Sequence, residues 1–261
     1  MILWAIAALL IFIPLPFGGV EEGAIFGLEA AAAALLALSI GTAKPSPDAI
    51  RAPFLFKILF AVFVGFTVLQ VIPLPLSVLE ALSPRSAEIH AGAAVGQAAW
   101  RTLSLSPNLS VYELLKYLSY AVFAFLVFRS VRTKKQAETL ILLMILAGAF
   151  EAVYGLFMLF SGSAEVFGWK NRWSQGSASG TFVNRDHYSA FLEMVFTLAV
   201  GYLLAKANFF SLKKGRSFRE KILWFGQERL GKAAILTLLS VVIGVGLFFS
   251  RSRSGILIFF L

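Results

Sequence analysis

Residues 139–160, TLILLMILAGAFEAVYGLFMLF, form an apolar run in which Glu151 is the only charged residue. The hydrocarbon core of a bilayer is about 30 Å thick, and about 20 helical residues are needed to cross it. The run is therefore long enough to span a membrane as a helix. A carboxylate at this depth costs roughly 2.5–3.5 kcal/mol on insertion scales, so we expect Glu151 to face the bundle interior or a wet cavity.

Further apolar runs of this kind extend along the chain in both directions. They predict an all-α fold, a polytopic transmembrane helix bundle with about seven complete spans and the start of an eighth. The predicted spans are residues 2–17, 23–43, 54–76, 111–128, 139–160, 188–205 and 233–250. Residues 256–261 begin the eighth span but are too few to cross a bilayer. We therefore expect this chain to be the N-terminal part of a longer one.

The composition supports a membrane protein and excludes several kinds of site. Hydrophobic residues make up 59% of the chain and charged residues only 14%, whereas a typical soluble domain carries roughly 25% charged residues. The absence of cysteine excludes disulfides, thiolate chemistry and cysteine-ligated metals in this stretch. Because His90 and His187 are the only histidines, a histidine metal cluster is not expected.

The basic residues are distributed unevenly between alternate loops, which predicts the orientation. Of the 23 Lys and Arg residues, fifteen fall in loops of one parity and eight in the others. The positive-inside rule places the richer loops, and the N-terminus with them, in the cytoplasm. The net charge of +9 thus indicates orientation and not nucleic-acid binding. We expect residues 1–261 to form a single transmembrane domain with periplasmic loops 77–110 and 161–187 and a basic cytoplasmic loop 206–232.

The outward loop before the sixth span concentrates polar and aromatic side chains. Aromatic faces stack on sugars and guanidinium groups pair with phosphates, although Trp169 and Trp173 are more readily explained as interfacial anchors. Arg185 opens the sixth span, at a helix N-terminus where the dipole also favours an anion. Glu193 lies seven residues after Asp186 on the same helix face and extends this polar stripe into the span.

A second cationic cluster, Ser250-Arg251-Ser252-Arg253-Ser254-Gly255, closes the seventh span on the outward side. Positive residues there run against the orientation rule and need another reason. The arginines before the sixth span and after the seventh are expected to converge on one anionic group such as a pyrophosphate. Because Arg251 and Arg253 are two residues apart, they would point to opposite sides of a helix, so only one of them is expected to face the site.

Three segments carry a resemblance to a known family. The stretch from Gly180 to Met194 resembles the G-x-F-x-N-x-N-x-x-A-x-x-L pattern of the O-antigen ligase and polymerase family, and it departs from that pattern at Asp186-His187. Residues 250–255 look like the S-x-S-R-x-G segment of the family, which puts the family arginine on Arg253. The outward stretch from Trp100 to Pro107 is similar to a segment that such proteins carry before a middle span.

The resemblance implies a bacterial inner-membrane glycosyltransferase with an inverting, metal-independent mechanism and no cofactor. It would transfer a glycan from undecaprenyl pyrophosphate to an acceptor such as lipid A core, another repeat unit or a protein. The catalytic histidine of the family lies on a periplasmic loop after the eighth span, so His187 is not given that role. No residue of this stretch is expected to be catalytic, and the fragment alone is expected to be inactive. The substrate-binding residues that the resemblance implies are Arg185, Arg253, Asn184, Tyr188, Glu193 and Arg251.

Other functions stay open at this point. A polymerase that extends the glycan would share the carrier chemistry and differ only in the acceptor. A multi-pass solute transporter would use Glu29, Glu151 and Glu193 as coupling acids, although the prolines cluster at span ends and not at mid-span breaks. A structural subunit would leave the outward arginines unexplained. The expected partners are a lipid-linked glycan donor, its acceptor and membrane lipids, without nucleic acid, and the oligomeric state stays open.

Overall fold

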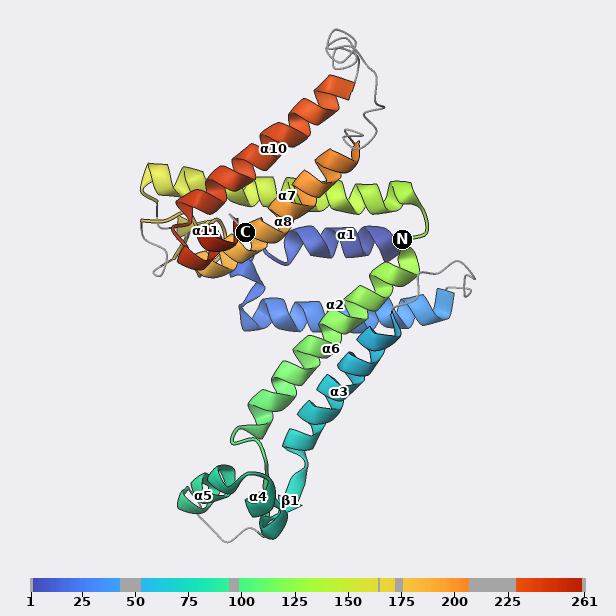
Figure 1. Cartoon of the computed structure of the whole chain (residues 1–261), viewed down its shortest axis with the longest axis vertical. Helices are drawn as coiled ribbons and strands as arrows, with labels where there is room; N and C mark the ends of the chain where they lie inside the picture. The colour runs from blue at the N-terminus through green and yellow to red at the C-terminus, as the bar shows by residue number, and fades with distance from the viewer. Residues whose placement is uncertain are drawn as a thin grey trace, which may run out of the picture. The chain divides into compact units, whose positions relative to one another are not determined.

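The computed structural model describes residues 2–42, 53–93, 99–163, 165–171, 176–206 and 229–259, and these are mostly helical. Figure 1 shows the course of the chain. The helices are α1 (Ile2–Phe12), α2 (Glu22–Thr42), α3 (Phe54–Val71), α4 (Leu76–Leu82), α5 (Pro84–Gly92), α6 (Pro107–Ser130), α7 (Lys134–Ser161), α8 (Arg185–Lys206), α10 (Arg229–Phe249) and α11 (Arg253–Phe259). Two short hairpins pair β1 (Pro73–Pro75) with β2 (Trp100–Thr102) and β3 (Glu165–Val166) with β4 (Trp169–Lys170).

The predicted membrane-type helical fold is confirmed, but the count of seven spans is not. Helices occur at all seven predicted positions. Within the described residues, five of them are long and apolar enough to cross a membrane, namely α2, α3, α6, α7 and α8. The other two predicted spans correspond to shorter apolar helices, Ile2–Phe12 and Ala233–Phe249.

Prolines account for the two helices that end earlier than predicted. The first span was expected to reach residue 17, but α1 ends at Phe12, just before Pro14 and Pro16. The third was expected to reach residue 76, but α3 ends at Val71. Proline disfavours helical backbone in the residue before it and has no N–H to continue the helix. The Pro73–Pro75 segment therefore forms strand β1, which pairs antiparallel with β2.

Contacts divide the chain into two compact units, and the prediction of a single transmembrane domain stays a prediction. One unit comprises residues 27–130, in which α3 and α6 lie side by side (Figure 1). Its loop between these helices contains α4 and α5, and the imidazole Nε2 of His90 on α5 lies 2.9 Å from the carbonyl oxygen of Thr102 on β2. The other unit comprises residues 3–26 and 131–261 and contains the core described next.

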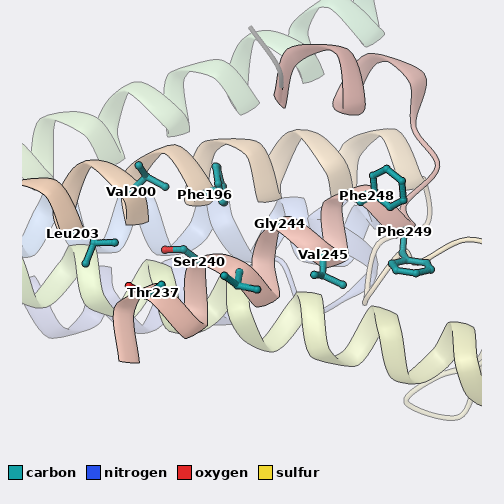
Figure 2. A pocket seen from close by; sticks show the side chains of 10 residues that line it. Phe196, Val200, Leu203, Thr237, Ser240, Gly244, Val245, Phe248 and Phe249 are labelled. Carbon is teal, nitrogen blue, oxygen red and sulfur yellow. The ribbon is translucent and has the colours of Figure 1, made fainter. Parts of the chain in front are cut away.

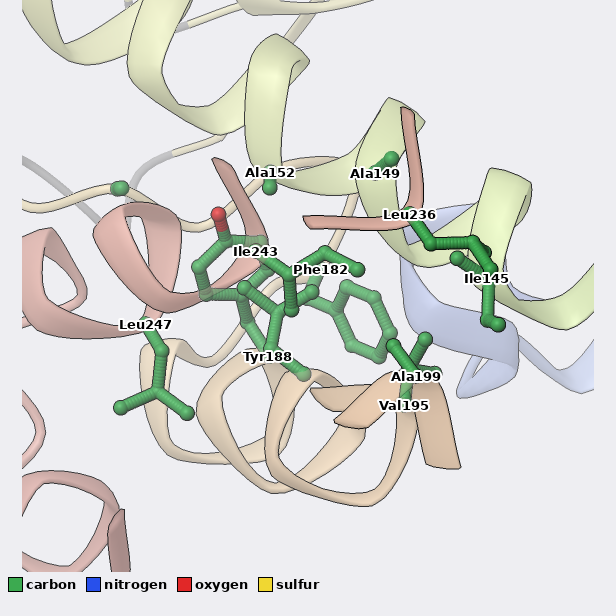
Figure 3. Close-up of a cluster of buried hydrophobic side chains, with 12 residues drawn as sticks. Ile145, Ala149, Ala152, Phe182, Tyr188, Val195, Ala199, Leu236, Ile243 and Leu247 are labelled. Atoms are coloured by element: carbon green, nitrogen blue, oxygen red, sulfur yellow. The ribbon is translucent and has the colours of Figure 1, made fainter. Parts of the chain in front are cut away.

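The core of this second unit lies where α7, α8 and α10 cross (Figures 1 and 3). Glycines let the helices approach closely, as small residues do at interfaces between membrane helices. A Cβ atom on Gly148 of α7 would lie 2.6 Å from Cγ1 of Val195 on α8. A Cβ atom on Gly246 of α10 would lie 2.8 Å from the Cβ of Ala152 on α7. The three helices are therefore packed through backbone surfaces that a larger side chain would separate.

Local signals fix where α7 begins and ends. Thr133 caps its start, because its hydroxyl accepts the N–H of Gln136 while the Gln136 side chain accepts the N–H of Thr133. Gly162 follows its end with a left-handed φ of 68°. At the Gln136 end, Lys206 of α8 forms an ion pair with Glu138 at 2.8 Å, so α8 runs antiparallel to α7.

Several predictions concern residues outside the described ranges. These are the interfacial anchor Trp173, most of the basic loop 206–232, and the last two residues of the predicted eighth span.

We expect Gly246→Val to lower the thermal unfolding midpoint of the purified protein in detergent. The new side chain would overlap Ala152 and the hydroxyl of Tyr188, and such overpacking typically costs about 1–3 kcal/mol. The matched control is Gly201→Val, because nothing lies within 4 Å of a Cβ atom at that position of α8. Equal unfolding midpoints for the two variants would contradict the close packing of α10 on α7.

Candidate functional site

The two predicted arginine segments are brought together where α11 packs on α8. The contact is made by Gly255, the third residue of α11. A Cβ atom there would lie 2.7 Å from Cβ and Oγ of Ser189 and 2.9 Å from Oε1 of Glu193. Ser189 lies one helical turn after Arg185, and Gly255 lies two residues after Arg253. The backbones that carry these two arginines therefore meet at one junction, which we call the α8–α11 junction.

The serines of residues 250–255 build the turn that makes this junction possible. The hydroxyl of Ser250 donates to the carbonyl of Leu247 at 2.6 Å and accepts the N–H of Ser252 at 3.1 Å. The hydroxyl of Ser252 accepts the N–H of Gly255 at 3.2 Å, so Ser252 is the N-cap of α11. Both serines are buried. Each hydroxyl thus satisfies a backbone group at the break between α10 and α11.

The prediction that Arg251 and Arg253 point to opposite sides of one helix is wrong. Arg251 lies in the turn after α10 and has a φ of 54°, whereas Arg253 is the first residue of α11. Left-handed backbone costs a non-glycine residue roughly 1–2 kcal/mol. At Arg251 the left-handed backbone changes the direction of the chain, so that α11 can pack on α8. Both arginine side chains are exposed.

The start of α8 is fixed by Asn184. Its side-chain oxygen accepts the N–H of Asp186 at 2.7 Å, and its carbonyl accepts the N–H of Tyr188 at 3.0 Å. Asn184 is therefore the N-cap of α8. Asn184 was expected to bind substrate, but its side chain instead caps α8. The cap fixes Arg185 as the first residue of that helix.

The remaining predicted site residues divide into buried and accessible ones. Tyr188 is 0% exposed and lies inside the core (Figure 3), so it does not offer its ring to a sugar. Glu193 is half-buried beside Gly255 at the α8–α11 junction. Arg185 is exposed at the N-terminal end of α8. Of the predicted contacts, the three arginines and Glu193 stay available to a ligand.

The arginines of the junction are not engaged within the described part of the chain. No hydrogen bond or ion pair links the guanidinium group of Arg185 or of Arg253 to another described residue, whereas Arg85, Lys116 and Lys206 each pair with a nearby glutamate. A guanidinium group offers five N–H donors in a planar fork that matches phosphate oxygens. The junction therefore presents donors that the described fold does not use.

A buried loop leads into α8 and was not foreseen from the sequence. Residues 177–182, here the inserted loop, are buried, although they are neither helix nor strand. The N–H of Ala178 donates to the carbonyl of Phe249 at the end of α10 at 2.9 Å. The side-chain amide of Asn171 donates to the carbonyl of Phe182 at 3.0 Å. The only sequence signal was the run of Gly, Ser and Thr, which also suits an exposed loop.

An apolar groove of about 490 Å³ runs between α8 and α10 (Figure 2). Phe196 and Leu203 line it from α8, and Phe248 lines it from α10. Its hydroxyl groups are satisfied within their own helix, because Thr237 and Ser240 donate to carbonyls four residues earlier. The groove thus offers apolar surface and no free polar group for catalysis.

The described residues contain no group of three or more His, Cys, Asp and Glu side chains that could hold a metal ion. A scan against protein-family models found no match, and searches of curated proteins and of solved structures found no significant match.

We expect cysteines placed at Ser189 and Gly255 to form a disulfide on mild oxidation. The ideal Cβ position at Gly255 lies 2.7 Å from the Cβ of Ser189, and a small shift reaches the usual Cβ separation of about 3.5–4.5 Å. These 261 residues contain no cysteine, so no native thiol within them competes for the cross-link. The linked peptides can be detected by mass spectrometry after proteolysis.

The control replaces Ser189→Cys by Met194→Cys, an exposed position elsewhere on α8. Equal cross-linking of the two pairs, or none in either, would show that α11 does not pack on α8 through Gly255.

Proposed function

We propose that this protein is a bacterial inner-membrane glycosyltransferase of the O-antigen ligase type. Its substrate is a glycan carried on undecaprenyl pyrophosphate, and its acceptor is a molecule such as lipid A core. The proposal combines the resemblance of residues 180–194 and 250–255 with the chemistry of the α8–α11 junction. Chain extension by a polymerase uses the same donor site, and the junction does not distinguish the two acceptors.

The observation that carries the proposal is that two segments about 70 residues apart in sequence, each with an exposed arginine, meet at the α8–α11 junction. The small and polar residues of both segments have structural tasks: Asn184 and Ser252 cap helices, and Gly255 permits the contact with α8. Arg185 and Arg253 have no such task among the described residues. Exposed cations at the predicted outward side of a membrane protein need a reason, and an anionic lipid headgroup supplies one.

In the proposed transfer, every bond, electron pair and proton can be accounted for without a metal ion. An acceptor hydroxyl oxygen attacks the anomeric carbon of the glycan, and the bond from that carbon to the pyrophosphate oxygen breaks. Undecaprenyl pyrophosphate leaves with the bonding electron pair, and the hydroxyl proton passes to a base that the resemblance places on a loop after the eighth span. Arg185 and Arg253 stabilise the charge that grows on the leaving pyrophosphate, as preorganised donors do in other transfer reactions.

We expect Arg185→Ala and Arg253→Ala in the full-length protein each to reduce glycan transfer. Removal of one donor that stabilises a developing charge typically lowers turnover about 10²–10³-fold. Lysine at either position retains the charge but loses the bidentate geometry, so its activity should lie between those of arginine and alanine. The measurement is polymer attachment in a strain that lacks the native copy, normalised to the amount of protein in the membrane.

The matched control is Arg132→Ala, which removes an exposed arginine from a loop predicted to be cytoplasmic. Unchanged transfer in both junction variants would remove the proposed role of these arginines.

A further inference from the structure

The inserted loop is attached to α7 by two hydrogen bonds to one buried carboxyl group. The N–H of Thr181 donates to Oε2 of Glu151 at 2.8 Å, and Oγ1 of Thr181 lies 2.8 Å from Oε1 of the same side chain. Glu151 is 1% exposed and Thr181 is 0% exposed. Ten residues separate Glu151 from Ser161, so at 1.5 Å per residue the loop reaches back about 15 Å along α7.

The same threonine also connects the loop to the N-terminal segment. Its Oγ1 lies 3.0 Å from the carbonyl oxygen of Pro14. The next residue, Phe182, packs on Gly18, where a Cβ atom would lie 2.5 Å from the phenyl ring. Three parts of the unit therefore meet at Thr181: the turn after α1, the middle of α7 and the segment before α8.

The number of hydrogens available at Thr181 indicates whether the carboxyl group of Glu151 is protonated or ionised. The hydroxyl has one hydrogen and lies within bonding distance of two oxygens, those of Pro14 and Glu151. If Glu151 carries a proton, it donates to Oγ1 of Thr181, and the hydroxyl donates to the carbonyl of Pro14. Every polar atom then has a partner. An ionised carboxylate would leave one of the two contacts without a hydrogen, and no described Lys, Arg or His forms an ion pair with it.

Glycines leave the space that this arrangement needs. Gly180 has a φ of 54°, and a Cβ atom there would collide with Oε2 of Glu151. A Cβ atom on Gly155, one turn after Glu151, would lie 2.8 Å from the backbone nitrogen of Gly180. Tyr188 closes the arrangement from α8, because its hydroxyl donates to the carbonyl of Glu151 at 3.4 Å. The carboxyl group is thus enclosed by backbone from the loop and by a side chain from α8.

We propose that the two hydrogen bonds between Glu151 and Thr181 form a clasp, in which Glu151 is neutral and acts as a positioning residue. The clasp holds the inserted loop in the bundle and thereby fixes the position of Arg185. Thr181 lies four residues before Arg185, and the intervening Asn184 caps α8. Displacement of the loop would therefore move the first turn of α8 relative to α11. The link to catalysis rests on the proposed function, whereas the clasp itself does not.

The test uses a reporter of loop position and an assay of transfer in the full-length protein. Ser177→Cys is the reporter, because Ser177 is 5% exposed and its hydroxyl has no hydrogen-bond partner among the described residues. Its reaction with a maleimide reports opening of the inserted loop. Transfer is measured as the maximal rate and as the donor concentration that gives half of that rate.

We expect Thr181→Val and Glu151→Ala each to raise the labelling rate by about tenfold or more, because each leaves buried polar groups unpaired and favours local opening. Both should also raise the donor concentration needed for half-maximal transfer. Glu151→Gln and Thr181→Ser should stay near the original values. The glutamine amide can donate to Oγ1 of Thr181 and its oxygen can accept the N–H, as a neutral acid does.

The matched control is Thr197→Val, because the hydroxyl of Thr197 donates to its own helix and is exposed. Unchanged labelling in both Thr181→Val and Glu151→Ala would overturn the clasp. Loss of transfer in Glu151→Gln with normal labelling would also overturn it, because an ionisable carboxyl would then be required. Faster labelling of Thr181→Val with no glycan transfer by the unsubstituted protein would support the clasp and overturn the proposed function.

Discussion

The fold of the site-bearing unit depends on one constraint: a non-helical stretch of backbone placed inside an apolar helix bundle must find all its hydrogen bonds within the protein. Lipid supplies none, so irregular backbone at such depth is tolerated only where protein surrounds it. Several backbone groups of the inserted loop find partners in different parts of the unit. The N–H of Thr181 bonds to Glu151 on α7, the N–H of Ala178 to Phe249 at the end of α10, and the carbonyl of Phe182 to Asn171 after β4. A buried carboxyl group that would be costly if alone is thereby the acceptor that makes the loop possible.

Close packing follows from the same arrangement. Gly148, Gly155 and Gly246 keep α7 and α10 free of side chains where α8 and the inserted loop approach. Between apolar helices in lipid, the hydrophobic effect adds little, so association depends on van der Waals contact and on hydrogen bonds. The glycines allow the backbones to come into van der Waals contact, and the clasp provides hydrogen bonds between them. Both act on the backbone that carries Arg185 to the α8–α11 junction.

The two arginine segments show how structural and functional residues are interleaved. In each segment a capping residue, Asn184 or Ser252, begins a helix, and the next residue is an exposed arginine. A residue that follows an N-cap is fixed in direction but has no side-chain task of its own in the cap. This placement gives two cations a defined position without internal partners among the described residues, which suits recognition of a phosphate-bearing headgroup in the proposed reaction.

The sequence by itself determined the membrane character, the positions of the seven apolar helices and the arginine at the start of α8, because apolar run length and local charge are properties of neighbouring residues. It also identified Glu151 as a carboxyl group that needs an internal partner. The predicted ends of α1 and α3 were too late, because prolines end both helices earlier. Tyr188 was predicted to contact the substrate, although its side chain is buried. Only the tertiary structure decided that Thr181 is the partner of Glu151 and that Gly255 rests on Ser189. These pairs are 30 and 66 residues apart, and contacts at such separations depend on how helices pack, which no local pattern encodes.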